Sequence, residues 1–277
     1  MPGTLPYADE RVPVAPGVTL RVLRWEGALR PFLLVHGLAS NALLWTGVAE
    51  VLAAAGHQVV AVDLRGHGES DAPPDGYSTG QAAVDLAALR SELGLQAPVL
   101  VGQSWGGNVV LAHAARYGGG HAVACVDGGW LHLGDRFATW EECWAALAPP
   151  RFTDLSATAL ADLLTERHPD WPPPSVAATL ANLRVRPDGT VESRLAREHH
   201  AGILRSMWAD APRDRYASVG VPVLLVPAGD PAGPSAGLVE EARRLLPQAT
   251  VRWYAGADHD IHAQHPAELA ADLLSLT

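Results

Sequence analysis

The sequence contains no lysine, and its charge balance excludes several classes of function. All 20 basic residues are arginine, against 30 acidic residues, so the formal net charge is −10. An acidic protein is a poor candidate for binding nucleic acid or an anionic membrane surface. Isoleucine and asparagine are also scarce while alanine is abundant, which indicates codon bias in a GC-rich genome more than a functional constraint.

Cysteines and long apolar runs are also in short supply. The two cysteines, Cys125 and Cys143, do not make a disulfide framework, and the apolar run around Cys125 predicts a reduced, buried thiol. No stretch of about 18 or more apolar residues is free of charges and turn formers, so we expect no membrane span. The opening residues, MPGTLPYADERV, lack the charged and apolar regions of a signal peptide. We therefore expect a cytoplasmic protein of enzyme size.

What the chain does contain is hydrophobic residues in a regular order. They make up 48% of the 277 residues, which is enough to bury a large core. Short apolar runs alternate with longer helical segments before residue 130 and again after residue 218. The runs lie at 31–35, 58–63, 98–102, 122–127, 221–230 and 250–256, preceded by a partly alternating strand-like run at 19–25. The helical segments lie at 41–56, 78–95, 106–118, 238–247 and 266–276. This alternation predicts βαβ units and a mostly parallel sheet with helices on both faces.

The segment between these two parts has a different composition. Residues 130–218 are rich in tryptophan, proline, arginine and helix formers, and contain few strand-like runs. We therefore predict one α/β core, formed by residues 1–129 and 219–277, that is interrupted by a helical lid at 130–218.

A serine between glycines follows one of the predicted strands. Residues 102–107 read GQSWGG after the apolar run PVLV. Clusters of this kind are often plain turns, but here a strand precedes the cluster and a helix follows it. In that setting Gly-x-Ser-x-Gly is a nucleophile elbow, in which small neighbours permit a sharp turn and the serine hydroxyl projects above the sheet. The N-terminus of the next helix favours negative charge near Ser104, which makes Ser104 the candidate nucleophile.

Four segments, in the same order along the chain, resemble the α/β-hydrolase superfamily. They are FLLVHGLASNALLW (32–45), VVAVDLRGHGESDAP (59–73), LVGQSWGGNVVLAHAARY (100–117) and YAGADHDIHAQHPAEL (254–269). The chain is most similar to the lid-bearing esterases, lactonases, carbon–carbon bond hydrolases and imino-peptidases. The resemblance implies an α/β-hydrolase fold with a mostly parallel central sheet flanked by helices, a helical lid inserted after the sixth strand, and catalysis without a cofactor.

The resemblance also assigns roles to two loops. His36-Gly37 matches the oxyanion loop, so the main-chain N–H groups of Leu38 and of Trp105, the residue after the nucleophile, are the expected donors to a developing oxyanion. Gly37 is then expected beside the substrate, and His36 is expected to hold the loop by hydrogen bonds. The segment 63–71, DLRGHGESD, is expected to brace neighbouring loops.

A serine nucleophile needs a base to take its proton, and twelve histidines are available. His259 follows the late strand-like run and precedes Pro266 at the start of the last helix. The resemblance assigns the catalytic histidine to this position. His262 would make a metal pair with His259, but no further ligands lie at zinc-like spacing, so we expect no metal.

The carboxylate that orients the base has two candidates. Asp230 follows the run PVLLVPA, which is the commonest position in the family, and it is the preferred one. The turn departs from the family's usual Gly-x-x-Asp, because Gly229 and Asp230 are adjacent. Asp127 ends the run AVACVD, and some relatives, including the dehalogenase branch and certain lipases, carry the acid there. Either carboxylate could fix the imidazole tautomer and stabilise the imidazolium.

Nine tryptophans against three phenylalanines suggest an aromatic-lined site. Most of the tryptophans are expected to fill the core of the lid, while Trp105 and Trp130 are the candidates for lining an apolar pocket above Ser104.

The sequence thus predicts a serine hydrolase that cleaves carboxylic ester or lactone bonds of a hydrophobic or aromatic small molecule through an acyl-enzyme. Carbon–carbon bond hydrolysis, imino-peptidase activity and acyl transfer by the same triad stay open. A non-catalytic binding protein on the same scaffold is the least favoured alternative. The sequence does not indicate an oligomeric state.

Overall fold

The fold is organised around an eight-stranded sheet with the strand order β1-β2-β4-β3-β5-β6-β9-β10. The computed structural model describes residues 5–118, 120–152, 155–246 and 248–277, so residues 1–4 of the opening segment interpreted above lie outside it. The strands are β1 (Ala8–Ala15), β2 (Val18–Trp25), β3 (Leu29–Val35), β4 (His57–Val62), β5 (Val99–Gln103), β6 (Ala122–Val126), β9 (Val223–Val226) and β10 (Ala249–Val251). β1 pairs with β2 and β2 with β4 in the antiparallel sense, and the other pairs are parallel. The predicted mostly parallel sheet is confirmed.

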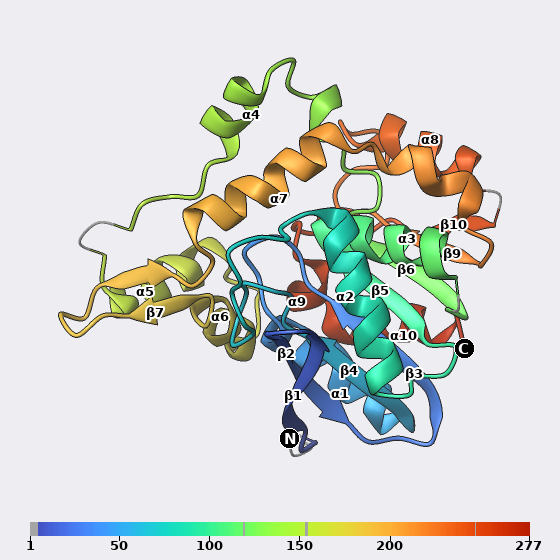
Figure 1. Cartoon of the computed structure of the whole chain (residues 1–277), viewed down its shortest axis with the longest axis horizontal. Helices are drawn as coiled ribbons and strands as arrows, with labels where there is room; N and C mark the ends of the chain where they lie inside the picture. Colours follow the sequence, from blue (N-terminus) through green and yellow to red (C-terminus); the bar gives the residue numbers. More distant parts are fainter. Residues whose placement is uncertain (1–4, 119, 153–154, 247) are drawn as a thin grey trace.

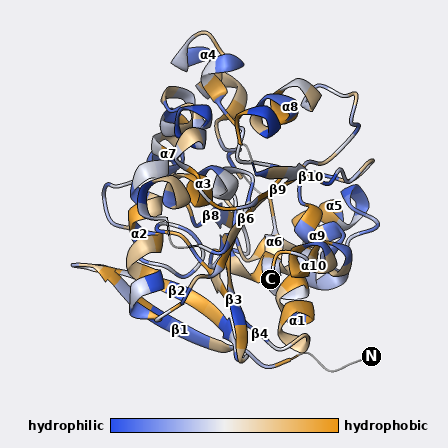
Figure 2. Cartoon of the chain, turned by 90° about the vertical axis from the view of Figure 1, so that its right-hand side faces the viewer, coloured by the Kyte–Doolittle hydropathy of each residue, from blue (hydrophilic) through white to orange (hydrophobic). Residues whose placement is uncertain are grey.

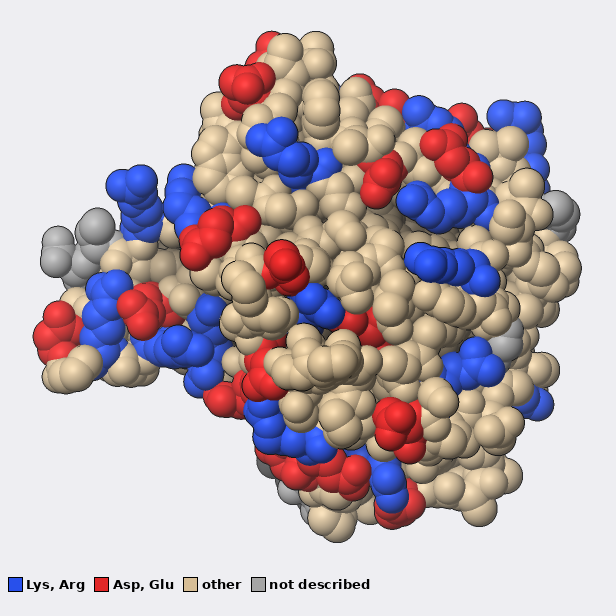
Figure 3. Space-filling model, in the orientation of Figure 1, with Lys and Arg blue, Asp and Glu red and all other residues tan. Residues whose placement is uncertain are grey.

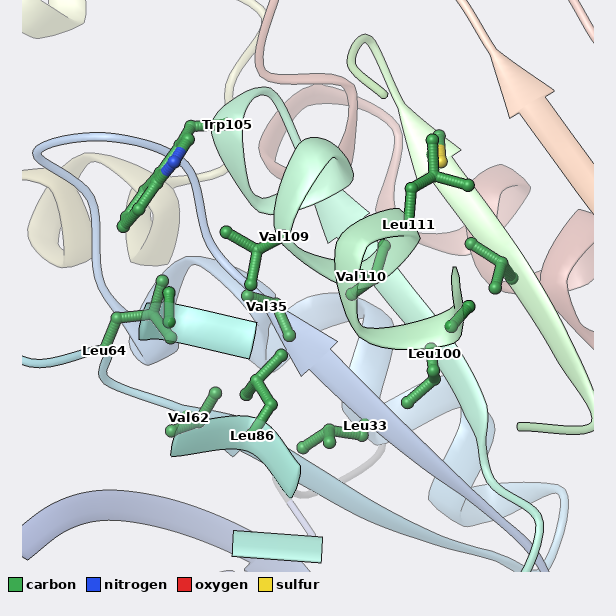
Figure 4. Close-up of a cluster of buried hydrophobic side chains, with 14 of the residues drawn as sticks. Leu33, Val35, Val62, Leu64, Leu86, Leu100, Trp105, Val109, Val110 and Leu111 are labelled. Carbon is green, nitrogen blue, oxygen red and sulfur yellow. The ribbon is translucent and has the colours of Figure 1, made fainter. Parts of the chain in front are cut away.

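The central strands are continuous apolar runs because both of their faces are covered. Successive side chains point to opposite faces of a strand, so Leu33 and Val35 of β3 belong to one hydrophobic cluster and Phe32 and Leu34 to another. The first cluster packs against α2 (Thr79–Glu92), α3 (Trp105–Tyr117) and α8 (Ala236–Leu245), and the second against α1 (Thr46–Ala54) and α10 (Pro266–Leu274). Figure 4 shows Val109 of α3 and Leu86 of α2 close to Leu33 and Val35.

The apolar colour in Figure 2 is concentrated on α1 and on the strands next to it, as this two-faced packing requires. β1, which the sequence interpretation did not include, pairs with a neighbouring strand along only one of its edges and is largely exposed.

Both cysteines are buried free thiols, which confirms the prediction for Cys125. In the described part of the chain, no helix has the length and apolar character needed to cross a membrane.

Residues 130–218 form an inserted segment between β6 and β9. It contains η2 (Leu133–Asp135), α4 (Trp140–Leu147), α5 (Ala157–Arg167), α6 (Pro173–Leu180), β7 (Leu183–Val185), β8 (Val191–Ser193), α7 (Arg197–Ala209) and η3 (Pro212–Ser218). The segment is mostly helical, but β7 and β8 add a small antiparallel sheet that the sequence interpretation did not include. Figure 1 shows α4 and α7 on one side and α5, α6 and β7 as a lobe that extends from the sheet. On the face seen in Figure 3, acidic and basic side chains are interspersed.

Candidate active site

Ser104 lies at the turn between β5 and α3 and has a strained backbone, with φ 53° and ψ −123°. Its N–H donates a hydrogen bond to the Val126 carbonyl oxygen at 2.8 Å, which fixes the turn against the end of β6. Ser104 occupies the N-cap position of α3, but its side chain does not cap the helix. Residues that hold such backbone conformations cluster at functional sites. Ser104 is half-buried, and its backbone conformation makes it a candidate functional residue.

Glycines on three sides make this turn possible. A Cβ atom at Gly102 would lie 2.1 Å from the carbonyl oxygen of Gly106, and one at Gly128 would lie 2.1 Å from the carbonyl oxygen of Ser104. A Cβ atom at Gly37 would lie 2.9 Å from Ser104 Cβ. The loops after β3, β5 and β6 therefore meet at Ser104. Gly37 packs directly against the serine, and its expected place beside the substrate stays a prediction.

The loop after β3 carries the first expected oxyanion donor. Ala39 has a positive φ of 58°, and its N–H donates to His67 Nε2 at 3.2 Å. This bond fixes the loop next to Leu38, which is half-buried. Trp105, the second expected donor, is the first residue of α3, where a main-chain N–H has no acceptor within the helix. Both N–H groups thus border the nucleophile turn.

Two buried histidines brace this region. His36 Nδ1 donates to the Gly37 carbonyl oxygen at 2.7 Å and its Nε2 accepts from the Leu64 N–H at 3.0 Å. His67 Nδ1 donates to the Arg65 carbonyl oxygen at 3.0 Å. Burial lowers the pKa of His36 to about 4 and that of His67 to about 3, so both rings are neutral at pH 7. The expected structural role of His36 and of the segment 63–71 is confirmed.

We expect the free energy of unfolding to fall when the pH falls from about 6.5 to about 4. The unfolded chain binds a proton on His36 near its ordinary pKa of 6.5, whereas the folded chain does so only near 4, so acid favours the unfolded state over this interval. The loss from His36 alone is on the order of 3 kcal/mol. Urea unfolding at pH 7.5, 6 and 5 measures it.

The variant His36→Gln should be less stable than the wild type at pH 7.5 but should lose less further stability on acidification. His121→Gln, at a half-buried position outside this network, is the control. Its free energy of unfolding should depend on pH as that of the wild type does. If the free energy of unfolding of His36→Gln fell with pH as steeply as that of the wild type, His36 would not be the acid-sensitive group.

His259 lies in the loop between β10 and α9 (Ile261–Gln264). Its Nδ1 is 2.5 Å from Asp127 Oδ2, and Asp127 Oδ1 accepts the Ala228 N–H at 3.1 Å. Partial burial lowers the pKa of His259, but the hydrogen bond and the charge of Asp127 outweigh it and hold that pKa above its ordinary value. The imidazole is therefore oriented by a carboxylate, and its Nε2 stays available for a proton.

The preference between the two carboxylates has to be reversed. Asp230 is exposed, and its Oδ1 accepts the Ala232 N–H at 2.8 Å, so it closes its own turn. Asp127 directly follows β6, the strand next to β5 in the sheet, and has a positive φ of 41° that turns the chain sharply at that edge. The structure therefore brings His259 together with Asp127 and leaves Asp230 apart.

Gln103 connects the loop of His259 to the turn of Ser104, and the sequence interpretation missed it. Its Nε2 donates to the His259 carbonyl oxygen at 3.1 Å. Gln103 is buried and immediately precedes Ser104. The loop that carries His259 is thus attached to the residue beside the nucleophile.

The two tryptophans chosen as pocket residues are buried in the core. The side chain of Trp105 is buried in the core and donates from Nε1 to Thr79 Oγ1 at 3.1 Å, and Trp130 is buried in the same cluster. Large aromatic side chains fill core space next to a functional loop as readily as they line a cavity. Their burial gives no support to a substrate-binding role for these side chains, which stays a prediction.

A cavity of about 400 Å³ lies instead between Ala39 and the inserted segment. Its walls are mainly apolar. They include Leu147, Pro149, Phe152, Leu160, Leu164 and Leu183, with Thr179, Asn182, Ser193 and His200 as polar members. None of the described residues that line it is Asp, Glu or Arg.

His262, the histidine considered as a metal partner of His259, lies in the core. Its ring is fully buried and packs on Trp45 with 4.5 Å between ring centroids, and burial lowers its pKa to about 3. Among the residues that the structure describes, no group of three or more His, Cys, Asp or Glu side chains is arranged to hold a metal.

Comparisons with known proteins agree with this architecture. A family model described as alpha/beta hydrolase fold matches residues 30–266. A non-heme chloroperoxidase from Streptomyces lividans is 27% identical over 88% of this chain and 90% of its own length. The other curated relatives considered, at 34–40% identity, align over only 33–40% of this chain and 19–40% of their own lengths.

Two solved structures are similar over nearly the whole chain. E-2-(acetamidomethylene)succinate hydrolase is 26% identical, covers 98% of both chains and superposes with a TM-score of 0.78. An esterase from Mycobacterium tuberculosis is 25% identical, with a TM-score of 0.75 over 98% of this chain and 90% of the esterase.

Proposed function

The chain belongs to the alpha/beta hydrolase family, and on that premise we propose that it is a serine hydrolase that cleaves carboxylic ester or lactone bonds of a hydrophobic small molecule. The observation that carries the proposal is the pair of His259 and Asp127, 2.5 Å apart. His259 belongs to a loop that Gln103 ties to the strained turn of Ser104. The combination supplies a nucleophile, a base and an orienting acid.

The proposed reaction has two halves. Ser104 Oγ attacks the carbonyl carbon while His259 Nε2 takes the hydroxyl proton, and the carbonyl oxygen becomes an oxyanion next to the Leu38 and Trp105 N–H groups. The leaving oxygen then takes the proton from His259 as its bond to the carbonyl carbon breaks. A water molecule, deprotonated by the same imidazole, attacks the acyl-enzyme and releases the acid and Ser104.

We assign the acyl group of the substrate to the apolar cavity. Ala39, which lines it, is the neighbour of the proposed donor Leu38. An uncharged wall favours an uncharged chain or ring, because an unpaired ion is costly to bury. In this proposal residues 130–218 act as the lid, and residues 1–129 and 219–277 as the core.

A fluorophosphonate probe followed by peptide mass spectrometry tests the nucleophile. The wild type should be labelled on Ser104 and Ser104→Ala should not. Absence of labelling on the folded wild type would contradict the proposal and favour a binding protein. A panel of esters, lactones, amino-acid amides and acyl acceptors then distinguishes ester cleavage from amide cleavage and acyl transfer.

Filling the cavity should change the choice of substrate. We expect Leu164→Trp to lower kcat/KM for octanoyl and decanoyl p-nitrophenyl esters at least about tenfold and to leave the acetyl ester nearly unchanged, because a misfit of one methylene is already worth about tenfold or more. Leu163 precedes it on α5, and its side chain is exposed rather than part of the cavity wall. Leu163→Trp is therefore the matched control and should keep the wild-type profile. If kcat/KM depended on acyl-chain length in the same way in both variants, the cavity would not be the acyl-binding site.

A further inference from the structure

We infer that His168, in the inserted segment, is a positioning residue for the catalytic base. It acts through Asp258, the residue before His259. The contact fixes the position of His259 relative to the inserted segment. The inference rests on the proposed function, because it concerns the same site.

The contact itself joins distant parts of the chain. His168 Nδ1 lies 2.9 Å from Asp258 Oδ2, across 90 positions of sequence. The His168 side chain is about one-fifth exposed and that of Asp258 less than half. The pair is thus partly shielded from water, where a charge-assisted hydrogen bond has more effect than on an open surface.

A second connection holds the same aspartate from its main chain. The Asp258 N–H donates to Gln264 Oε1 at 2.7 Å, and Gln264 Nε2 donates in turn to Asp170 Oδ2. Asp170 is two residues from His168. Both the side chain and the backbone of Asp258 are therefore held by groups that lead to residues 168–170.

The segment around His168 is itself fixed. The His168 ring stacks on Trp171 with 4.1 Å between centroids. Trp171 is buried in a small cluster with Leu44 and Ala263, and Ser175 Oγ donates to the Ala263 carbonyl oxygen at 3.0 Å. Residue 263 belongs to α9, which directly follows the loop of His259. The segment that carries His168 is therefore packed against the core where it contacts Asp258.

His259 needs such a support because little else restrains it. Its side chain is about half exposed, and its two hydrogen-bond partners within the described residues are Asp127 and Gln103, which donates to the His259 carbonyl oxygen. A displacement of about 1 Å between reacting groups can cost about 100-fold in rate. Holding Asp258 in place keeps His259 in reach of both Asp127 and the nucleophile.

The test compares His168→Ala with His168→Asn in the full-length protein. Asparagine can place its Nδ2 where the histidine Nδ1 donates, so it should restore what alanine loses. We expect His168→Ala to lower kcat and the rate of fluorophosphonate labelling roughly tenfold with KM within twofold, and His168→Asn to recover to within threefold of the wild type. The double variant His168→Ala/Asp258→Ala should be no slower than either single variant.

Arg186→Ala is the matched control, because it removes an ion pair with Glu192 that lies inside the inserted segment. It should leave kcat within twofold. Unchanged kcat and labelling in His168→Ala, or a raised KM with normal kcat, would overturn the inference.

A readout independent of turnover separates the inference from the proposed function. The proton between His259 Nδ1 and Asp127 should give a downfield resonance in ¹⁵N-histidine-labelled protein. That resonance should broaden in His168→Ala and persist in His168→Asn. An unaltered resonance in His168→Ala contradicts the inference even if the wild type proves inactive on every ester, whereas an unlabelled wild type with the expected change in resonance contradicts only the proposed function.

Discussion

Ser104→Ala and His259→Ala should each lower kcat by about 10⁶-fold, and the double variant should lose no more than either single variant. Nucleophile and base act as a unit, so removing one leaves the other without a role. The expected remainder over the uncatalysed reaction is about 10³-fold, supplied by the oxyanion donors and by binding. Pre-steady-state kinetics with the best ester of the panel measures the effect, since loss of Ser104 must also remove the acyl-enzyme burst.

Alanine is a suitable replacement at position 104, because it leaves the glycines that form the turn unchanged. Ser91→Ala, at an exposed position on α2, controls for expression and handling and should keep full activity. A Ser104→Ala protein that retained more than a few per cent of wild-type kcat would place the nucleophile elsewhere.

Asp127→Asn should lower kcat by about 10⁴-fold, whereas Asp230→Asn should leave it within twofold. Asparagine tolerates the positive φ at position 127 and keeps the shape of the side chain, but it cannot hold the tautomer of His259 that accepts a proton from serine. At position 230 the same change touches only an exposed turn. Steady-state kinetics of the two variants side by side measures the difference.

The pH profile gives an independent check on the same pair. Asp127 holds the pKa of His259 above its ordinary value, so wild-type kcat/KM should rise with pH through that raised pKa as the imidazole loses its proton. In Asp127→Asn the residual activity should rise at a lower pH. A large loss in Asp230→Asn, with a normal pH profile in Asp127→Asn, would restore the original preference.

Much of the fold could be predicted because its signals are local. The parallel strands are continuous apolar runs, and Gly102, Ser104 and Gly106 define a turn that few other sequences allow. The position of His259 after β10 followed from the family resemblance. The strands that were missed, β1, β7 and β8, are short or largely exposed, so their sequences lack the apolar pattern of buried strands.

The orienting acid could not be chosen from the sequence, because the choice depends on distance in space. Asp127 and Asp230 follow neighbouring strands, β6 and β9, and only the path of the His259 loop decides between them. The burial of the Trp105 side chain in the core could not be predicted for a related reason, since composition does not reveal which way a side chain points. Gln103 and His168 act across long separations in sequence, and no local pattern marks them.

The exposed turn closed by Asp230 has a practical consequence. It connects β9 to α8 without contributing a group to the proposed reaction, so a change there should leave turnover intact. Because the chain has no lysine, Ala232→Lys would create its sole side-chain amine. An amine-reactive fluorophore could then be attached at one chosen, exposed side chain on the molecule.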